Sequence, residues 1–285
     1  MTLAEKIIAK AAGRDNVEPG EIVTCTVDLA MIHDSGGPRR VKPAMEKLGV
    51  NVWDPVKVVL VSDHFAPCTD AESAAILKLT RQWAAEQGIT NFYDQQGICH
   101  VVTPERGHLA PGMFAVGGDS HSPTGGAFGC YMFGIGATDM LGILVTGETW
   151  LKVPETICIN WSGKLSEGVA AKDMALKMCA TLGMDGGGYQ AVQYSGETIE
   201  NLDMMERMTL CNMAAELGAQ AGLIEPDETT ATYITAAGGN PGDWAAFCSD
   251  ADAEYKTTHE FAAADLAPQV AAPHSPANAA DVSDI

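Results

Sequence analysis

The chain is short of basic residues. It has 17 lysines and arginines against 37 aspartates and glutamates, for a formal net charge of −20 over 285 residues. A field of that sign disfavours binding to nucleic acid and to anionic membrane surfaces. It also disfavours a small anionic substrate unless local arginines or a metal override it, and the sequence has few arginines.

Closely spaced cysteines and long apolar runs are also missing. No two of the eight cysteines form a C-x-x-C pair, which argues against a zinc or iron–sulfur site built from them alone and favours buried thiols. No apolar run is long enough to span a bilayer. Residues 1–13 lack the apolar core of a signal peptide, so we expect a cytoplasmic protein. The cysteines are Cys25, Cys68, Cys99, Cys130, Cys158, Cys179, Cys211 and Cys248.

Strand-like and helix-like segments alternate along the chain, which predicts an α/β protein with mainly parallel sheets. A boundary near Lys152 would divide it into two consecutive domains, 1–152 and 153–285, and the Ala- and Pro-rich stretch 262–285 is expected to be a linker. The predicted strands are 21–27, 56–62, 91–93, 113–116, 156–161 and 190–194. The predicted helices are 3–12, 41–48, 69–87, 127–146, 166–182, 203–218 and 228–236.

The stretch from Ile98 to Met140, ICHVVTPERGHLAPGMFAVGGDSHSPTGGAFGCYMFGIGATDM, carries the clearest chemical signal. Polar residues just past the carboxyl ends of buried strands are where open α/β sheets place their sites. A carboxylate beside an imidazole fixes the tautomer of the imidazole and raises the pKa of that ring. Such an imidazole is suited to donating a proton. One such pair is usually structural, but four histidines after apolar segments predict a single pocket. These residues are Asp63-His64, Asp119-Ser120-His121, His33 and His100.

Two other interpretations of the glycine-rich run GGDSHSPTGG are weaker. A phosphate cradle would need a following lysine, which is absent. A serine hydrolase of this type, with Ser120 as nucleophile, would need a histidine near the C-terminus with an aspartate three residues before it, and neither His259 nor His274 has one. Farther along, Asn212 and Glu216 lie four residues apart in a predicted helix; they form either a solvated stripe or, given their apolar neighbours, a buried functional pair.

Three segments together resemble the aconitase superfamily, specifically the large subunits of 3-isopropylmalate dehydratase and their relatives. They are VSDHFAPC, the stretch quoted above, and MERMTLCNMAAELGAQAGLIEPDETT. These segments are spaced through the chain in family order, so the resemblance covers essentially the whole chain. The resemblance implies an aconitase-like three-layer α/β/α fold and a hydro-lyase for a small hydroxy-dicarboxylate. It favours 3-isopropylmalate in leucine biosynthesis over dimethylmalate, citraconate or maleate. A non-catalytic binding or assembly module is the alternative of another class.

The resemblance also implies roles for individual residues. The match assigns protonation of the departing hydroxyl to Asp63 and His64, and a second catalytic pair to His100 and Asp119. Substrate contact is implied for His33, Ser120 and His121. Support of a [4Fe-4S] cluster and its bound hydroxyl is implied for Asn212 and Glu216.

The chain departs from the family pattern in one respect. The family's cluster cysteines lie in a later domain with a GSCTN-like motif, so we expect them beyond Ile285 and predict no metal ligands in this chain. The resemblance implies that the arginines that hold substrate carboxylates lie mostly there and in a small swivelling subunit that also supplies the base. We therefore expect the first two-thirds of a large subunit, which by itself binds no cluster and is inactive. The expected partners are the small subunit and a small dicarboxylate.

Overall fold

The computed structural model describes residues 1–285. Its first sheet has five parallel strands in the order β4-β3-β2-β5-β6. The two central strands β3 and β2 are buried along their whole length, as strands covered on both faces must be. The strands are β2 (Leu29–His33), β3 (Val58–Ser62), β4 (Phe92–Asp94), β5 (Phe114–Gly117) and β6 (Tyr131–Gly134).

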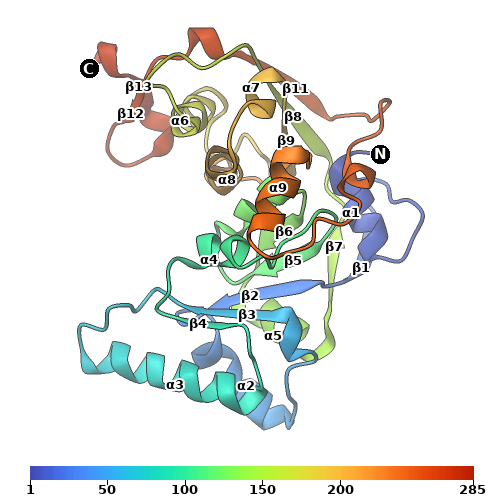
Figure 1. Ribbon diagram of the computed structural model, residues 1–285, viewed down its shortest axis with the longest axis vertical. Helices are drawn as coiled ribbons and strands as arrows, with labels where there is room; N and C mark the ends of the chain where they lie inside the picture. The colour runs from blue at the N-terminus through green and yellow to red at the C-terminus, as the bar shows by residue number, and fades with distance from the viewer.

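Helices cover both faces of this sheet. Figure 1 shows α2 (Pro38–Leu48), α3 (Ala71–Gln87) and α5 (Ala137–Thr146) on one side and α4 (Cys99–Glu105) on the other. Local sequence fixes the ends of α3: the Asp70 side chain accepts the Ser73 N–H, and Gly88 adopts the left-handed conformation that ends many helices. The amino-terminal helix α1 (Leu3–Ala11) begins with a capping box between Thr2 and Glu5.

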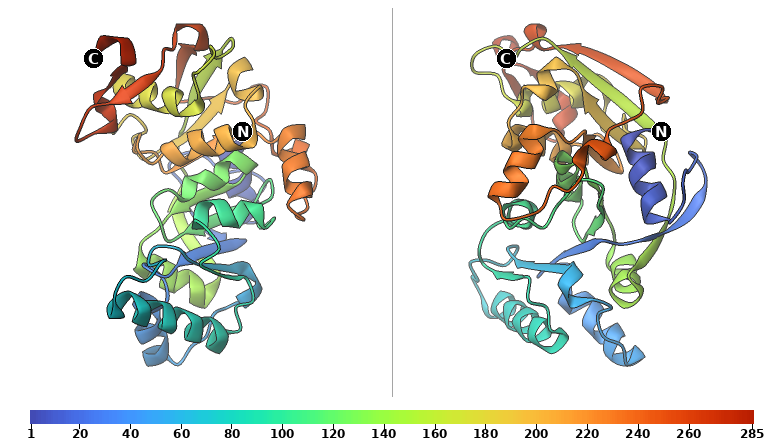
Figure 2. Two further views of the ribbon diagram at one scale, coloured as in Figure 1. Left: turned by 60° about the vertical axis from the view of Figure 1, so that its left-hand side comes forward. Right: turned by 45° about the vertical axis from the view of Figure 1, so that its right-hand side comes forward.

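A second parallel sheet, in the order β10-β9-β8-β11, follows. It lies toward the opposite end of the molecule from α2 and α3 (Figure 2). Its elements are β8 (Thr156–Ser162), α6 (Ala171–Leu182), β9 (Ala191–Ser195), α7 (Glu197–Glu200), α8 (Met204–Met213), β10 (Ala221–Ile224), α9 (Glu228–Ala236) and β11 (Thr257–Ala262). Outside the two sheets, β1 (Ile22–Thr26) pairs antiparallel with β7 (Glu148–Lys152). The predicted α/β fold with mainly parallel sheets is confirmed, and none of its helices combines the length and apolar character that a membrane span requires.

Several predicted elements were wrong in detail. The single helix expected over 127–146 is a 3₁₀ segment (Ser122–Phe128), strand β6 and helix α5, because Gly129 turns the chain in the left-handed conformation. Helix α6 begins at Ala171, after a left-handed Gly168, and α8 ends at Met213. The expected linker contains a hairpin of β12 (Gln269–Ala271) and β13 (Ala279–Asp281), held to α6 where the Gln269 N–H bonds Asp173.

The hydrophobic interior runs across the two sheets. One cluster joins Val59 and Val61 of the first sheet to Ile159, Trp161 and Tyr194 of the second. The second cluster, around α1, likewise includes Leu223 of β10. Each sheet therefore depends on the other for part of its core. The division into 1–152 and 153–285 stays a prediction.

Candidate active site

Three adjacent strands deliver most of the candidate residues to one edge. His33 is the last residue of β2, Asp63 and His64 follow β3, and the run Asp119 to His121 follows β5. Because β3, β2 and β5 are parallel neighbours, their carboxyl ends coincide, as the sequence predicted. His100 was expected after a strand but lies in the first turn of α4, the helix that follows β4.

His64 lies between two carboxylates. Its Nδ1 is hydrogen-bonded to Asp63 Oδ1 at 2.7 Å, and its Nε2 lies 3.7 Å from Asp119 Oδ2. Asp119 and then Asp63 raise the pKa of His64 to about 10, against an opposing effect of partial burial. The imidazole is therefore protonated at neutral pH and has a proton to donate.

Asp119 connects the two catalytic pairs expected from the sequence. Its Oδ1 accepts hydrogen bonds from His100 Nε2 at 2.8 Å and from the backbone N–H of His121 at 2.8 Å. The bond from His100, followed by the contact with His64, holds the pKa of Asp119 far below its ordinary value. This carboxylate stays ionised and orients both imidazoles. For Asp63, burial raises the pKa, but the bonds from His64 and the Cys99 backbone outweigh it and the net pKa is lowered.

The ring of His33 stacks on that of His64, with centroids 4.0 Å apart and planes 12° apart. His33 Nε2 is hydrogen-bonded to the Gly118 carbonyl at 2.9 Å, and Nδ1 accepts the Gly36 N–H at 3.3 Å. Burial and the neighbouring charge of His64 lower the pKa of His33, so this ring is the neutral member of the stack. It braces the loop after β5 against β2, and its predicted contact with substrate stays a prediction.

Sequence analysis missed Asp34. This carboxylate is fully buried and accepts the backbone N–H groups of His64 at 3.2 Å and of Phe65 at 3.1 Å. It thereby fixes the turn that presents His64 at the end of β3. Its position directly after His33 and a buried strand was the signal that could have identified it.

Glu216 and Asn212 both reach the loop after β5, although only Asn212 lies within α8. The prediction that the two share a helix face was therefore wrong, because Glu216 lies in the turn beyond the helix. Glu216 Oε1 is 3.2 Å from His121 Nε2, and Asn212 Nδ2 donates to Thr124 Oγ1 at 3.0 Å. Both residues thus support the loop that contains Asp119. Their role toward a cluster stays a prediction.

Ser120 Oγ lies 3.0 Å from His121 Nδ1, so serine, histidine and Glu216 form a connected series. A serine hydrolase needs such a series, and here it forms without His259 or His274. Geometry alone therefore allows two chemistries at this edge, nucleophilic attack by Ser120 or proton transfer by His64 and His100.

A cavity of about 340 Å³ opens at this edge. Its walls include His33, His64, Asp119 and Ser120 together with Arg39 and Arg40 from the start of α2. Sequence analysis did not single out these arginines, although they follow the Gly-Gly-Pro turn after His33 in a chain that has few of them.

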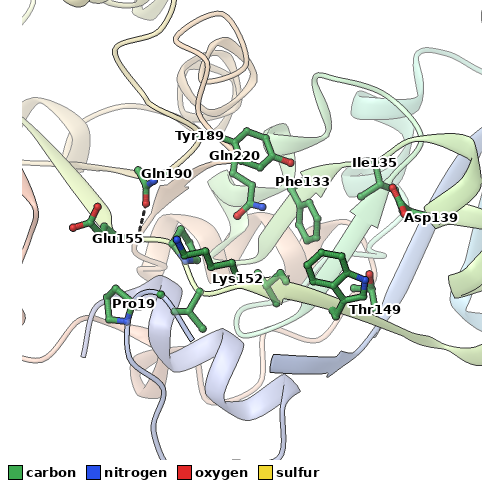
Figure 3. Close-up of a pocket in the computed structure, with 15 residues that line it drawn as sticks. Pro19, Phe133, Ile135, Asp139, Thr149, Lys152, Glu155, Tyr189, Gln190 and Gln220 are labelled. Carbon is green, nitrogen blue, oxygen red and sulfur yellow. Dashed lines mark hydrogen bonds between the residues drawn. The ribbon is translucent and has the colours of Figure 1, made fainter. Parts of the chain in front are cut away.

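A larger cavity, of about 470 Å³, lies beside β7 and is shown in Figure 3. Phe133, Tyr189 and Lys152 line it, and Gln190 Oε1 accepts the Glu155 N–H there at 2.7 Å. None of the candidate site residues lines this cavity. His33, His64 and Asp119 line the smaller cavity instead.

The cysteines do not suit an iron–sulfur cluster. Six of the eight are buried in the core, and burial raises the pKa of Cys25 to about 12 and of Cys179 to about 11, which disfavours the thiolate a cluster requires. The one group of potential ligand atoms close enough for a metal contains no cysteine. It consists of His33, Asp34, Asp63 and His64, whose atoms already bond one another and the backbone.

An α/β fold with carboxylate-held imidazoles at the carboxyl edge of a parallel sheet is typical of an enzyme. Comparison with known proteins gives the class of enzyme. The family model for the aconitase family (aconitate hydratase) matches residues 5–285. The chain belongs to the aconitase family, which is a family of hydro-lyases. Enzymes of this family generally use a [4Fe-4S] cluster.

Individual relatives agree with the family assignment. The chain is 44% identical over 287 residues to the probable 3-isopropylmalate dehydratase large subunit of Methanothermobacter thermautotrophicus, covering 100% of this chain and 68% of the relative. It is 44% identical to the probable methanogen homoaconitase large subunit of the same organism, covering 96% and 64%. The 3-isopropylmalate dehydratase large subunit of Aquifex aeolicus is 42% identical, with 100% and 66% covered. The chain thus spans about two-thirds of the length of these relatives.

Proposed function

We propose that this chain forms the acid half of the active site of a 3-isopropylmalate dehydratase, a hydro-lyase of leucine biosynthesis. The observation that carries the proposal is His64, held protonated between Asp63 and Asp119 at the cavity. Loss of water from a hydroxy-dicarboxylate requires a proton for the departing hydroxyl. His64 Nε2 is the donor that we assign to that step.

The remaining groups keep this proton in place. Asp63 binds Nδ1 of His64, so the second proton of the imidazolium lies on Nε2, which lines the cavity with Asp119. Asp119, bonded to His100, balances the charge of His64 before the transfer. After the transfer, His100 continues to hold Asp119 at the same distance from Nε2. Ser120 adds to the cavity wall, and His121 lies behind it, with Nδ1 3.0 Å from Ser120 Oγ.

The substrate and the partner are proposed from the relatives, several of which are named as large subunits of 3-isopropylmalate dehydratase. One relative is named as a homoaconitase subunit, so a longer tricarboxylate is the second candidate. We propose that a small subunit supplies the base that removes the carbon-bound proton. We also propose that this chain by itself does not hold the cluster of the family, since no three of its cysteines meet.

The experiment is the substitution His64→Gln in the enzyme assembled with its small subunit and cluster. We expect kcat to fall by about 10² or more, because general acid catalysis is lost, while iron content stays at the parent value. His259→Gln, on β11 and remote from the cavity, is the matched control and should keep parent activity. Turnover of the His64 variant within a factor of about three of the parent would remove His64 from the reaction.

A further inference from the structure

The unpaired arginines of this acidic chain are concentrated at the candidate site. Of the six arginines, Arg14, Arg81 and Arg207 form ion pairs with carboxylates. Arg39, Arg40 and Arg106 contact no carboxylate in the structure. Two of these three are adjacent in sequence and line the same cavity as His64 and Asp119. Because the chain has 37 acidic residues, arginines without a carboxylate partner are unexpected in it.

The guanidinium of Arg39 is fixed in place with its outer edge free. Its Nε donates to the Ser35 carbonyl at 2.7 Å, and its Cζ lies 5.4 Å from the centroid of the Phe65 ring. The two Nη atoms have no hydrogen-bond partner within the protein. Since Phe65 directly follows His64, these contacts also tie Arg39 to the loop that presents the proton donor.

Arg40 brings a second positive charge to the same wall. It is exposed, and none of its guanidinium nitrogens is hydrogen-bonded to another residue. Both arginines belong to the first turn of α2, which begins after Gly37 without a side-chain cap. The positive end of the helix dipole therefore adds to the two guanidinium charges.

A dianionic ligand entering this cavity meets the ionised Asp119, whose repulsion must be offset. We propose that Arg39 and Arg40 together bind one carboxylate of the substrate and select dicarboxylates over monocarboxylates. The free Nη edge of a guanidinium matches a carboxylate in a two-bond geometry, which lysine cannot reproduce. This inference deepens the proposed function and rests on it.

The test compares ligand affinities of the 285-residue chain by ligand-observed NMR at millimolar concentrations. The probes are 3-isopropylmalate, citraconate and citrate, with 4-methylpentanoate as a branched monocarboxylate. We expect the parent to prefer the polycarboxylates. The double variant Arg39→Gln/Arg40→Gln should weaken their binding at least about tenfold and leave the monocarboxylate within about twofold.

Matched variants separate the two-bond geometry from charge alone. Arg106→Gln removes an exposed unpaired arginine outside the cavity and should change no affinity. Arg39→Lys keeps the positive charge but loses the pair of parallel N–H donors, so it should weaken polycarboxylate binding nearly as much as Arg39→Gln. The single variant Arg40→Gln alters a side chain without partners, which protects the test if the double variant folds poorly.

Each outcome of these affinity measurements supports or overturns the inference. Unchanged polycarboxylate affinity in the double variant overturns the inference, as does equal weakening by Arg106→Gln. A parent that binds none of the polycarboxylates also overturns it. If citrate or citraconate binds in an arginine-dependent way while 3-isopropylmalate does not, the arginine pair stands and the proposed substrate fails.

Discussion

Removing the charge of Asp119 without changing its shape tests the electrostatic reasoning at the centre of the site. In Asp119→Asn the side-chain oxygen can still accept from His100 Nε2 and from the His121 N–H, both at 2.8 Å in the parent. What disappears is the negative charge 3.7 Å from His64 Nε2, the largest cause of the raised pKa. An opposite charge at this distance typically shifts a pKa by about 1–3 units. We therefore expect the pKa of His64 to fall from about 10 by at least about one unit.

Stability should follow the same charges. A histidine whose pKa is raised by folding stabilises the protein fully below its ordinary value of 6.5, and that contribution is lost as the pH rises toward 10. The lowered pKa of Asp119 stabilises the protein above its ordinary value of 3.8 and is lost below it. The parent should therefore be more stable than Asp119→Asn, and the difference in free energy of unfolding should be largest between pH 4 and 6.5. With His64 about one-third exposed, we expect a difference of only about 1–2 kcal/mol.

The assay is an NMR titration of the histidine Cε1–H signals, with His64→Gln used to assign His64, combined with urea unfolding at pH 5.5 and pH 9.5. Asp252→Asn removes an exposed carboxylate that contacts no histidine and serves as the control. A His64 pKa that is the same in the parent and Asp119→Asn would refute the reasoning. A stability difference that grows from pH 5.5 to pH 9.5 would refute it as well.

Two further predictions concern the interior. Asp227→Ala should lower the free energy of unfolding, measured by urea denaturation, by about 3–5 kcal/mol. The reason is that Arg207, which is only 1% exposed, loses the carboxylate that accepts two of its hydrogen bonds, at 2.8 and 2.6 Å. A loss below about 1 kcal/mol would contradict this. Gly126→Ala should cost at least about 1–3 kcal/mol, since its Cβ would lie 1.6 Å from the Gly222 carbonyl oxygen. Gly142→Ala, with open space around it in α5, should be neutral or slightly stabilising, and equal losses in the two glycine variants would argue against the close contact.

Local signals in the sequence predicted the elements well where caps and apolar runs were strong. Asp70 and Gly88 set the ends of α3, and Val58–Ser62 reads as a buried strand from its composition alone. The signals failed where several glycines follow one another. Residues 127–146 contain a strand and a helix separated by Gly134 and Gly136, and their apolar content fits either one. The hairpin near the carboxyl terminus was missed because its stability comes from packing on α6, which leaves no periodicity in the sequence.

For the site, the chain alone indicated which residues share a sheet edge, since the carboxyl ends of parallel neighbouring strands must coincide. His33, Asp63, His64 and Asp119 were therefore predictable as a group. How they interact was not. The assignment of His64 as the proton carrier and His33 as its neutral neighbour depends on a stack of 4.0 Å and a contact of 3.7 Å between residues far apart in the sequence.

The sequence by itself thus determined the fold class, the family and the set of histidines and acids that meet. Tertiary structure decided the opposite pKa shifts of His33 and His64 and added Asp34, Arg39 and Arg40 to the site. The reason is physical. The alternation of strands and helices and their buried patterns follow from local composition. A pKa or a free guanidinium edge depends instead on distances of a few ångströms between separate segments, which only the packed chain defines.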